Sequence, residues 1–377
     1  MLRTPSSRWI AATFTLLLAL ILGACQAGAS PSEPAEESPP DETVAESAAA
    51  TDEATPEPEP ASITFALPVS VPDEGQVWAY VPSGAGFFEE ENLEVTFVPS
   101  EGGGDALRQV ATGNADVSVG SPENMLNAVN EGLDLRAVAT VITTQIFDIA
   151  VLPDGDVHSY DELRGGRVGP SSFTSGSFPF AKFALAENGI DPETEVEFVP
   201  VGSGGPALEA LRNGEVDALS TWDTQLAGFS ILGTELETLP PASNASFPAD
   251  QILVRTDFLD EQPDVVARFT RAVMKGIVFA NAHPEEAIEM FREQFPESAA
   301  ARSAEESVAV LEQRLTNMQL RDDQEGWGWI PIDAYAELQA AALELETVVA
   351  GQDLEAIMTN ELADQIQDFD PEAVAGG

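Results

Sequence analysis

Hydroxyl side chains gather in one segment of this chain, residues 170–178, which reads PSSFTSGSF. A predicted strand at 167–169 precedes it, and a predicted helix at 176–188 follows it. Hydroxyls and the free N–H groups of a helix N-terminus can bind a sulfonate, carboxylate or phosphate. The alternative is a helix cap within a flexible loop. We expect a ligand to contact Ser172, Thr174, Ser175, Gly176 and Ser177.

A second candidate is the glycine-rich segment 100–105, which reads SEGGGD. Glycine has no Cβ, so the N–H groups that open the predicted helix at 105–111 can converge on a polar or anionic group. The alternative is a tight turn in which Asp105 is only an N-cap. We expect Gly103, Gly104 and Asp105 to lie at the ligand.

A third predicted strand ends in Gly120-Ser121-Pro122-Glu123. Pro122 suits the first turn of a helix and Ser121 its cap. The Ser121 hydroxyl or the Glu123 carboxylate can also face a ligand. Because Glu123 would repel an anion, it favours a neutral or amine-bearing ligand.

Two tryptophans are candidate stacking residues. Trp222 lies between Thr221 and Asp223, where the ring offers a flat face and Asp223 a partner for an amine or a ring N–H. The alternative is a buried Trp beneath a capped helix. Ser70 and Trp78 follow the first predicted strand, and Trp78 suits the core as well as it suits a ligand.

None of these strand-end loops contains Lys or Arg. A small, fully charged anion would therefore depend on backbone dipoles. A larger organic ligand, such as an aminosulfonate or a pyrimidine, fits the mixture of hydroxyls, acids and aromatic rings better.

The elements that position these residues alternate between short β-rich runs and amphipathic helical stretches from Ile63 onward. Such alternation predicts an α/β fold with parallel sheets covered by helices. Ligands of open α/β sheets bind at the carboxyl ends of the strands. After a last strand at 251–255, the pattern predicts helices only.

An internal repeat suggests two similar halves. Residues 95–116 (VTFVPSEGGGDALRQVATGNAD) align without a gap with residues 196–217 (VEFVPVGSGGPALEALRNGEVD), and ten of the 22 positions are identical. Each copy reads as strand, turn, helix, turn and strand. We therefore expect two lobes whose strand ends face each other across a cleft that closes by hinge motion.

The start of the chain has the features of an export signal. Arg3 and Arg8 precede an apolar run at 9–24, which is shorter than the ~20 residues of a membrane-spanning helix. The run ends in Leu-Gly-Ala before Cys25, which resembles the bacterial lipobox. We expect a signal peptide at 1–24 and lipidation of Cys25, the alternative being an ordinary signal peptide with an incidental cysteine. Residues 25–62, rich in Pro, Glu, Ser and Ala, should form a disordered acidic linker.

Composition excludes several functions. With 16 Lys and Arg against 65 Asp and Glu, the net charge of −49 opposes nucleic-acid binding and attraction to anionic lipids. Cys25 is the only cysteine, so the chain has no intramolecular disulfide, no cysteine-based zinc site and no catalytic thiol. We expect no metal, no cofactor and no membrane contact except the lipid anchor.

Several short sequence motifs, in order along the chain, resemble those of a known family. They are GAGFFEEENLEV at 84–95, AL to GNAD at 106–116, DELRGGRVG at 161–169 and HPEEA at 283–287. Together they resemble the substrate-binding proteins of ABC importers for nitrate, sulfonates, taurine and thiamine precursors. Gly84 and Asn92 depart slightly from that pattern.

The resemblance implies a two-lobed periplasmic binding protein of type II. Lobe one would comprise residues 63–155 and 246–377, with the C-terminal helices packed back on it, and lobe two residues 156–245. The expected function is capture of a small organic solute, sulfonate- or taurine-like or thiamine-pyrimidine-like. The implied partners are an ABC permease and its ATPase, and the expected state is an exported monomer, lipid-anchored at the outer face of the cell membrane or in the periplasm.

Two alternatives remain open at this point. One is a binding lipoprotein that senses or scaffolds without a transporter. The other is an enzyme, because the fold also hosts a thiamine-pyrimidine synthase. That synthase depends on a Cys-rich motif that this chain lacks, and neither His158 nor His283 has catalytic or metal-ligand spacing. We therefore expect no enzyme.

Overall fold

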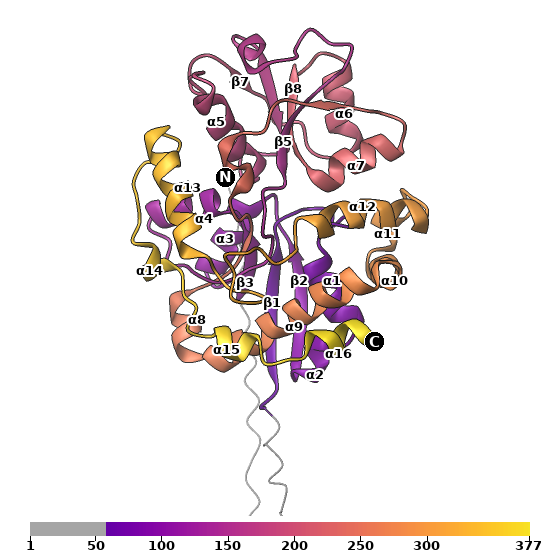
Figure 1. Cartoon of the computed structure of the whole chain (residues 1–377), viewed down its shortest axis with the longest axis vertical. Coiled ribbons are helices and arrows are strands. Elements are labelled where there is room, and N and C mark those ends of the chain that lie inside the picture. The colour runs from indigo at the N-terminus through magenta and orange to yellow at the C-terminus, as the bar shows by residue number, and fades with distance from the viewer. Residues whose placement is uncertain (1–57) are drawn as a thin grey trace, which may run out of the picture. The chain divides into compact units, whose positions relative to one another are not determined.

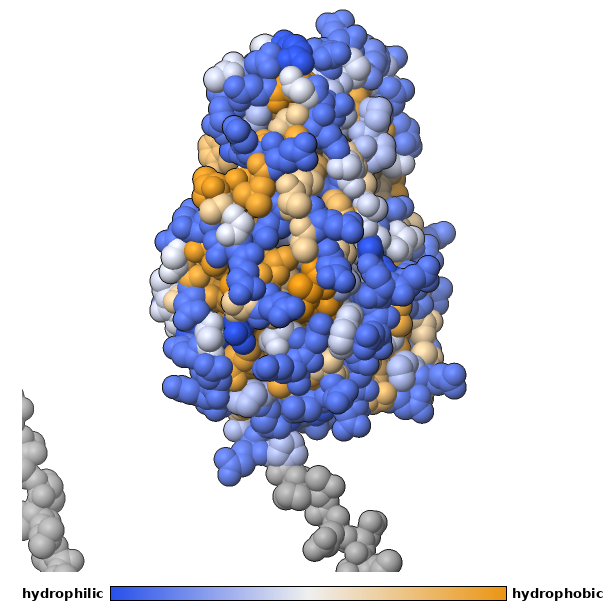
Figure 2. Space-filling model, turned by 60° about the vertical axis from the view of Figure 1, so that its left-hand side comes forward, coloured by the Kyte–Doolittle hydropathy of each residue, from blue (hydrophilic) through white to orange (hydrophobic). Residues whose placement is uncertain are grey.

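The computed structural model describes residues 58–377, which form two α/β lobes (Figure 1). The expected signal peptide, the Cys25 lipidation site and most of the expected linker lie outside the described residues. Within residues 58–377, no helix is both long enough and apolar enough to cross a membrane. Hydrophilic residues cover most of the face shown in Figure 2, as expected from the excess of acids.

Sheet A forms the centre of lobe one, with strand order β2-β1-β3-β10-β4. β1, β2 and β3 are parallel, whereas β10 runs antiparallel to both of its neighbours. Its strands are β1 (Ala61–Leu67), β2 (Leu93–Pro99), β3 (Val117–Gly120), β4 (Arg136–Thr140) and β10 (Gln251–Val254). The expected linker boundary at residue 62 is wrong, because Ala61 already pairs with Leu93.

Sheet B forms the centre of lobe two, with strand order β7-β6-β8-β5-β9. Its strands are β5 (Phe147–Val151), β6 (Arg167–Pro170), β7 (Glu197–Phe198), β8 (Ala218–Trp222) and β9 (Glu237–Thr238). β5 was expected in lobe one, but it pairs antiparallel with β8 and β9 and so belongs to sheet B. The chain therefore crosses between the sheets at 141–146 and returns at 239–250.

Helices cover both sheets. Lobe two carries α5 (Ser177–Glu187), α6 (Gly205–Arg212) and α7 (Asp223–Ile231), and short 3₁₀ turns lie at Tyr160–Leu163 and Ser243–Ser246. Lobe one carries α1 (Val77–Gly84), α2 (Phe87–Glu90), α3 (Gly103–Ala111), α4 (Pro122–Asn130) and α8 (Thr256–Glu261). The later helices are α9 (Pro263–Ala282), α10 (Pro284–Gln294), α11 (Pro296–Ala299), α12 (Ala304–Thr316), α13 (Ile332–Glu344), α14 (Leu354–Ile357), α15 (Ala363–Ile366) and α16 (Pro371–Gly376). Of these, α15 and α16 pack against α9, and α14 packs against β4.

The core of lobe one is built around aromatic rings. Phe65 of β1 packs against Trp78 of α1 and Phe269 of α9, with ring centroids 5.3 and 5.1 Å apart. α9 approaches α1 closely at Gly276, where an added Cβ would lie 2.5 Å from Cγ of Pro82. These contacts fix the start of α1, and with it the loop between β1 and α1 that borders the cleft.

Candidate functional site

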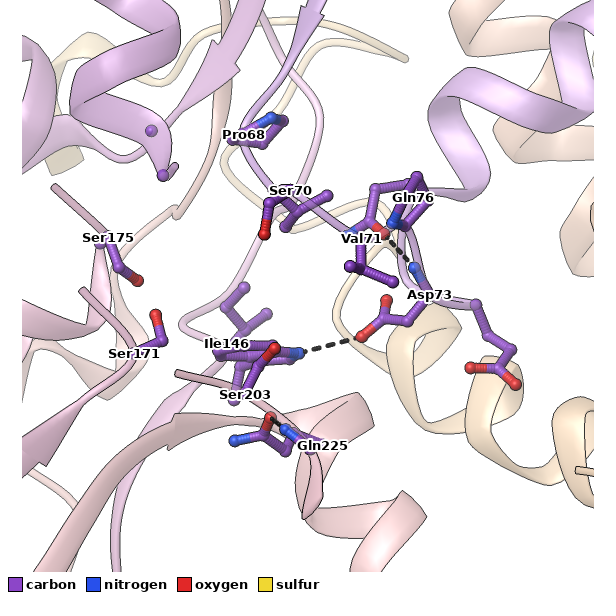
Figure 3. A pocket seen from close by; sticks show the side chains of 18 of the residues that line it. Pro68, Ser70, Val71, Asp73, Gln76, Ile146, Ser171, Ser175, Ser203 and Gln225 are labelled. Atoms are coloured by element: carbon purple, nitrogen blue, oxygen red, sulfur yellow. Dashed lines mark hydrogen bonds between the residues drawn. The ribbon is translucent and has the colours of Figure 1, made fainter. Parts of the chain in front are cut away.

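A cavity of about 520 Å³ lies between the two lobes. Lobe one contributes the carboxyl ends of β1 and β3, and lobe two contributes the ends of β6 and β8. Figure 3 shows the Ser171 and Ser175 side chains on one side of the cavity, with Ser70 and Asp73 across from them. Eight of the expected site residues line it: Ser70, Trp78, Gly103, Ser121, Ser172, Ser175, Gly176 and Trp222.

The remaining expected residues, Gly104, Asp105, Glu123, Thr174, Ser177, Thr221 and Asp223, do not line the cavity. Three of them support neighbours instead. Asp105 accepts a hydrogen bond from the backbone N–H of Glu101 at 3.1 Å. The hydroxyl of Ser177 lies 3.0 Å from that of Ser175, and Thr221 accepts a bond from the Gln225 amide at 2.6 Å. Ser175 and Gln225 both line the cavity, so these residues orient groups that a ligand can reach.

The loops after β2 and β6 bind each other across the cleft. The Ser172 and Thr174 hydroxyls both donate to the carbonyl oxygen of Glu101, at 2.7 and 3.0 Å. The Gly104 N–H donates to the carbonyl oxygen of Thr174 at 2.8 Å. Part of the hydroxyl-rich segment therefore joins lobe two to lobe one.

Asp223 is also part of the contact between the lobes. It opens α7, and its carboxylate accepts hydrogen bonds from Arg314 of α12 at 2.6 and 3.0 Å and from Asn317 at 2.9 Å. The Arg314 and Asp223 side chains are only 3% and 6% exposed. Since Arg314 and Asn317 satisfy the Asp223 carboxylate, it is not free to pair with an amine of the ligand.

Local sequence positions the helices that carry these groups. Ser303 and Glu306 form a reciprocal capping box at the start of α12, with backbone-to-side-chain bonds of 2.8 and 3.2 Å. At α4, Ser121 caps the helix by accepting from the Asn124 N–H at 3.2 Å, and Pro122 occupies the first turn. The capping role expected of Ser121 and Pro122 is thus confirmed.

Several cavity-lining residues were not expected from the sequence: Asp73, Glu74, Gln76, Phe147, Ser203, Gln225, Asp250, Arg302 and Arg314. Asp73 and Glu74 lie in the loop after β1. They could have been predicted, because ligands of α/β sheets bind at the carboxyl ends of the strands. Arg302 and Arg314 come from the C-terminal helical region. The strand-end loops contain no Lys or Arg, as stated above, but these two arginines reach the cavity from outside those loops.

Both arginines are paired with carboxylates of the protein itself. Arg302 pairs with the buried Glu74 at 2.9 Å, and Arg314 pairs with Asp223. Five carboxylate residues line the cavity: Asp73, Glu74, Glu101, Asp250 and Glu297. The lining therefore has an excess of negative charge, which favours a ligand that donates hydrogen bonds or carries positive charge.

Buried carboxyls make stability depend on pH. Burial raises the pKa of Glu123 to about 7, with Asp250 adding to the rise, and burial raises the pKa of Asp148 and Asp250 to about 6. Because the folded chain then binds more protons than the unfolded chain, stability falls as the pH rises from about 4 to about 7. We expect a higher melting temperature at pH 5 than at pH 8 in molar salt, by differential scanning fluorimetry. Glu123→Gln should reduce this difference, and an undiminished difference would contradict the assignment to Glu123.

Gly102 permits the close approach of the lobes. It has φ +144°, and a Cβ there would lie 2.7 Å from the backbone N of Ser175 and from the carbonyl carbon of Thr174. We expect Gly102→Ala to hold the lobes apart and to increase the radius of gyration measured by small-angle X-ray scattering. Gly205→Ala is the matched control, because no atom lies within 4 Å of that added Cβ. Equal radii for the two variants would contradict this role.

A family profile described as NMT1/THI5 like matches residues 77–287. The riboflavin-binding protein RibY of Chloroflexus aurantiacus is 25% identical over 293 residues, which cover 76% of this chain and 78% of RibY. The 4-amino-5-hydroxymethyl-2-methylpyrimidine phosphate synthase of Legionella pneumophila is 23% identical over 218 residues, covering 56% of this chain and 67% of that enzyme. Relatives of this chain thus include a binding protein and an enzyme.

Solved structures share the fold. The alkanesulfonate-binding protein SsuA from Xanthomonas axonopodis pv. citri, bound to MOPS, superposes with a TM-score of 0.64 at 15% identity, covering 80% of this chain and 99% of SsuA. The expected two-lobed periplasmic binding protein fold is therefore confirmed. The family resemblance inferred from the four sequence motifs is confirmed as well.

Proposed function

We propose that this chain, which belongs to the NMT1/THI5-like family, is the solute-binding component of an ABC importer. The observation that carries the proposal is the cavity of about 520 Å³ between the lobes. Its volume lies within the ~300–1,000 Å³ of small-molecule sites. Both lobes supply its walls, so a ligand there would contact both and favour the closed arrangement.

The proposed ligand is a thiamine-pyrimidine-like solute rather than a sulfonate- or taurine-like one. Carboxylates outnumber arginines in the lining, and both arginines are paired. Serine hydroxyls from the segment after β6 and the Trp222 ring offer hydrogen bonds and a stacking face for a polar heterocycle. A sulfonate would have to overcome the repulsion of the surrounding carboxylates.

We also propose where the protein acts in the cell. Export by the segment 1–24, lipidation at Cys25 and a monomeric state would place the cleft at the outer face of the cell membrane or in the periplasm. There it would deliver its solute to a permease driven by an ATPase. We propose no enzymatic activity, because the sequence holds one cysteine and lacks the Cys-rich motif that the synthase needs.

The test is a thermal-shift screen of the purified chain in molar salt. The panel comprises 4-amino-5-hydroxymethyl-2-methylpyrimidine, its formylamino analogue, riboflavin, taurine, ethanesulfonate, nitrate and amino acids. A ligand at ~100 times its Kd should add about 2.7 kcal/mol to the free energy of unfolding. We expect the pyrimidines to raise the melting temperature most. A shift from ethanesulfonate alone would overturn the ligand class, and turnover of a pyrimidine would overturn the non-enzymatic assignment.

A further inference from the structure

The five carboxylate residues that line the cavity differ in whether the protein itself satisfies them. Asp73 accepts from the Trp222 indole N–H at 3.3 Å and from the Thr224 hydroxyl at 3.2 Å. Glu74 accepts from Arg302 and, at 2.8 Å, from the Ser307 hydroxyl. The side chains of Glu101 and Glu297 are exposed, so water solvates them.

Asp250 is the exception. It is 9% exposed and lines the cavity, no residue among 58–377 donates a hydrogen bond to its carboxylate, and its oxygens are not among the fully enclosed atoms, so they are open to the cavity. A buried carboxylate without a partner is unfavourable, and groups of this kind are normally hydrogen-bonded. The nearby cation, Arg314, is already paired with Asp223. The side of Asp250 that remains for a partner is the cavity.

We infer that Asp250 is the anchor for a nitrogen of the ligand, which presents an N–H or a positive charge to this carboxylate. The inference rests on the proposed function and narrows it to amines, amidines and N–H-bearing heterocycles. Phe147 and Trp222 line the same cavity, and their ring faces suit a planar or cationic group beside the anchored nitrogen.

A second buried carboxyl lies close to Asp250. Glu123 of α4 is 2% exposed, and its Oε1 atom has no hydrogen-bond partner among the described residues. Repulsion from Asp250 contributes to raising the pKa of Glu123. Of the two, Glu123 therefore keeps its proton to higher pH, which leaves Asp250 as the ionised member of the pair near neutral pH.

The titratable groups around Asp250 come from four helices. They are Glu123 of α4, Asp223 of α7, Arg314 of α12 and Tyr335 of α13. Burial raises the pKa of Asp250 to about 6, Arg314 opposes the rise and Asp223 adds to it. A ligand nitrogen on Asp250 favours the ionised form, so binding releases a proton, and affinity rises as the pH rises through about 6.

The test titrates the purified chain with riboflavin and with 4-amino-5-hydroxymethyl-2-methylpyrimidine as N–H-bearing probes, and with ethanesulfonate as a probe without nitrogen. Asp250→Asn should reduce the affinity for whichever N–H-bearing probe binds, on the order of tenfold or more. Glu209→Gln is the control, since it removes a charge at an exposed position outside the cavity, and its affinity should stay within about twofold of the unmodified chain. The affinity of the unmodified chain should fall from pH 8 to pH 5, whereas that of Asp250→Asn should change less.

A second readout separates loss of the anchor from loss of the fold. Without ligand, Asp250→Asn should unfold at the same or a higher temperature, because it removes an unpartnered buried charge. Unchanged probe affinity in Asp250→Asn would overturn the anchor while leaving the proposed function in place. If no probe binds, the proposed ligand class fails. The melting temperature of Asp250→Asn without ligand then tests the anchor. A melting temperature clearly below that of the unmodified chain would show that Asp250 already has a structural partner and would overturn the inference.

Discussion

Replacing Arg314 with methionine is expected to lower the free energy of unfolding by about 3–5 kcal/mol, the usual effect of removing one partner of a buried ion pair. Asp223 would then be left buried with its charge only partly compensated by Asn317. Urea denaturation followed by circular dichroism measures the change.

The matched control is Arg108→Ala, which breaks an ion pair with Glu131 whose side chains are 48% and 56% exposed. This change should cost about 0–1 kcal/mol. The double variant Arg314→Met/Asp223→Leu should recover much of the loss, because apolar replacement of a whole buried pair is often nearly neutral. A loss below about 1 kcal/mol for Arg314→Met alone would contradict the view that this pair joins the lobes.

Replacing Trp222 with alanine is expected to weaken ligand binding by on the order of 30-fold, which corresponds to about 2 kcal/mol for a central aromatic residue. The ring lines the cavity at the end of β8, and its N–H bonds to Asp73 across the cleft. Truncation removes both a stacking face and a contact between the lobes. Calorimetric titration with the best solute of the panel gives the change in affinity.

Trp222→Phe separates these two contributions. It keeps an aromatic face and loses only the N–H donated to Asp73, so we expect a smaller loss of affinity than with alanine. Equal affinities for all three chains would show that the ligand does not contact the ring.

The fold could be predicted because most of the short strands are apolar runs followed by turn residues and a helix. The placement of β5 could not, because an antiparallel strand between two sheets has no local signal that says which sheet it joins. Register and sheet membership depend on long-range pairing, here of Phe147 with Trp222.

About half of the expected site residues line the cavity, because the carboxyl ends of parallel strands meet at one edge of a sheet. Asp250 could not be predicted in this way, because it does not follow a parallel strand. It precedes β10, which runs antiparallel, so the start of β10 lies beside Gly120 at the carboxyl end of β3. Arg302 and Arg314 reach the cavity only through packing of the C-terminal helical region, which no local pattern reveals.

The most direct test of a solute-binding cleft is a calorimetric titration of the purified chain with the pyrimidine that shifts its melting temperature most, in parallel with Gly102→Ala. We predict one site per chain, and weaker binding to Gly102→Ala because the added methyl group keeps the lobes from closing on the ligand. Binding with unchanged affinity in Gly102→Ala, in Trp222→Ala and in Asp250→Asn would place the ligand outside the cleft and contradict the account.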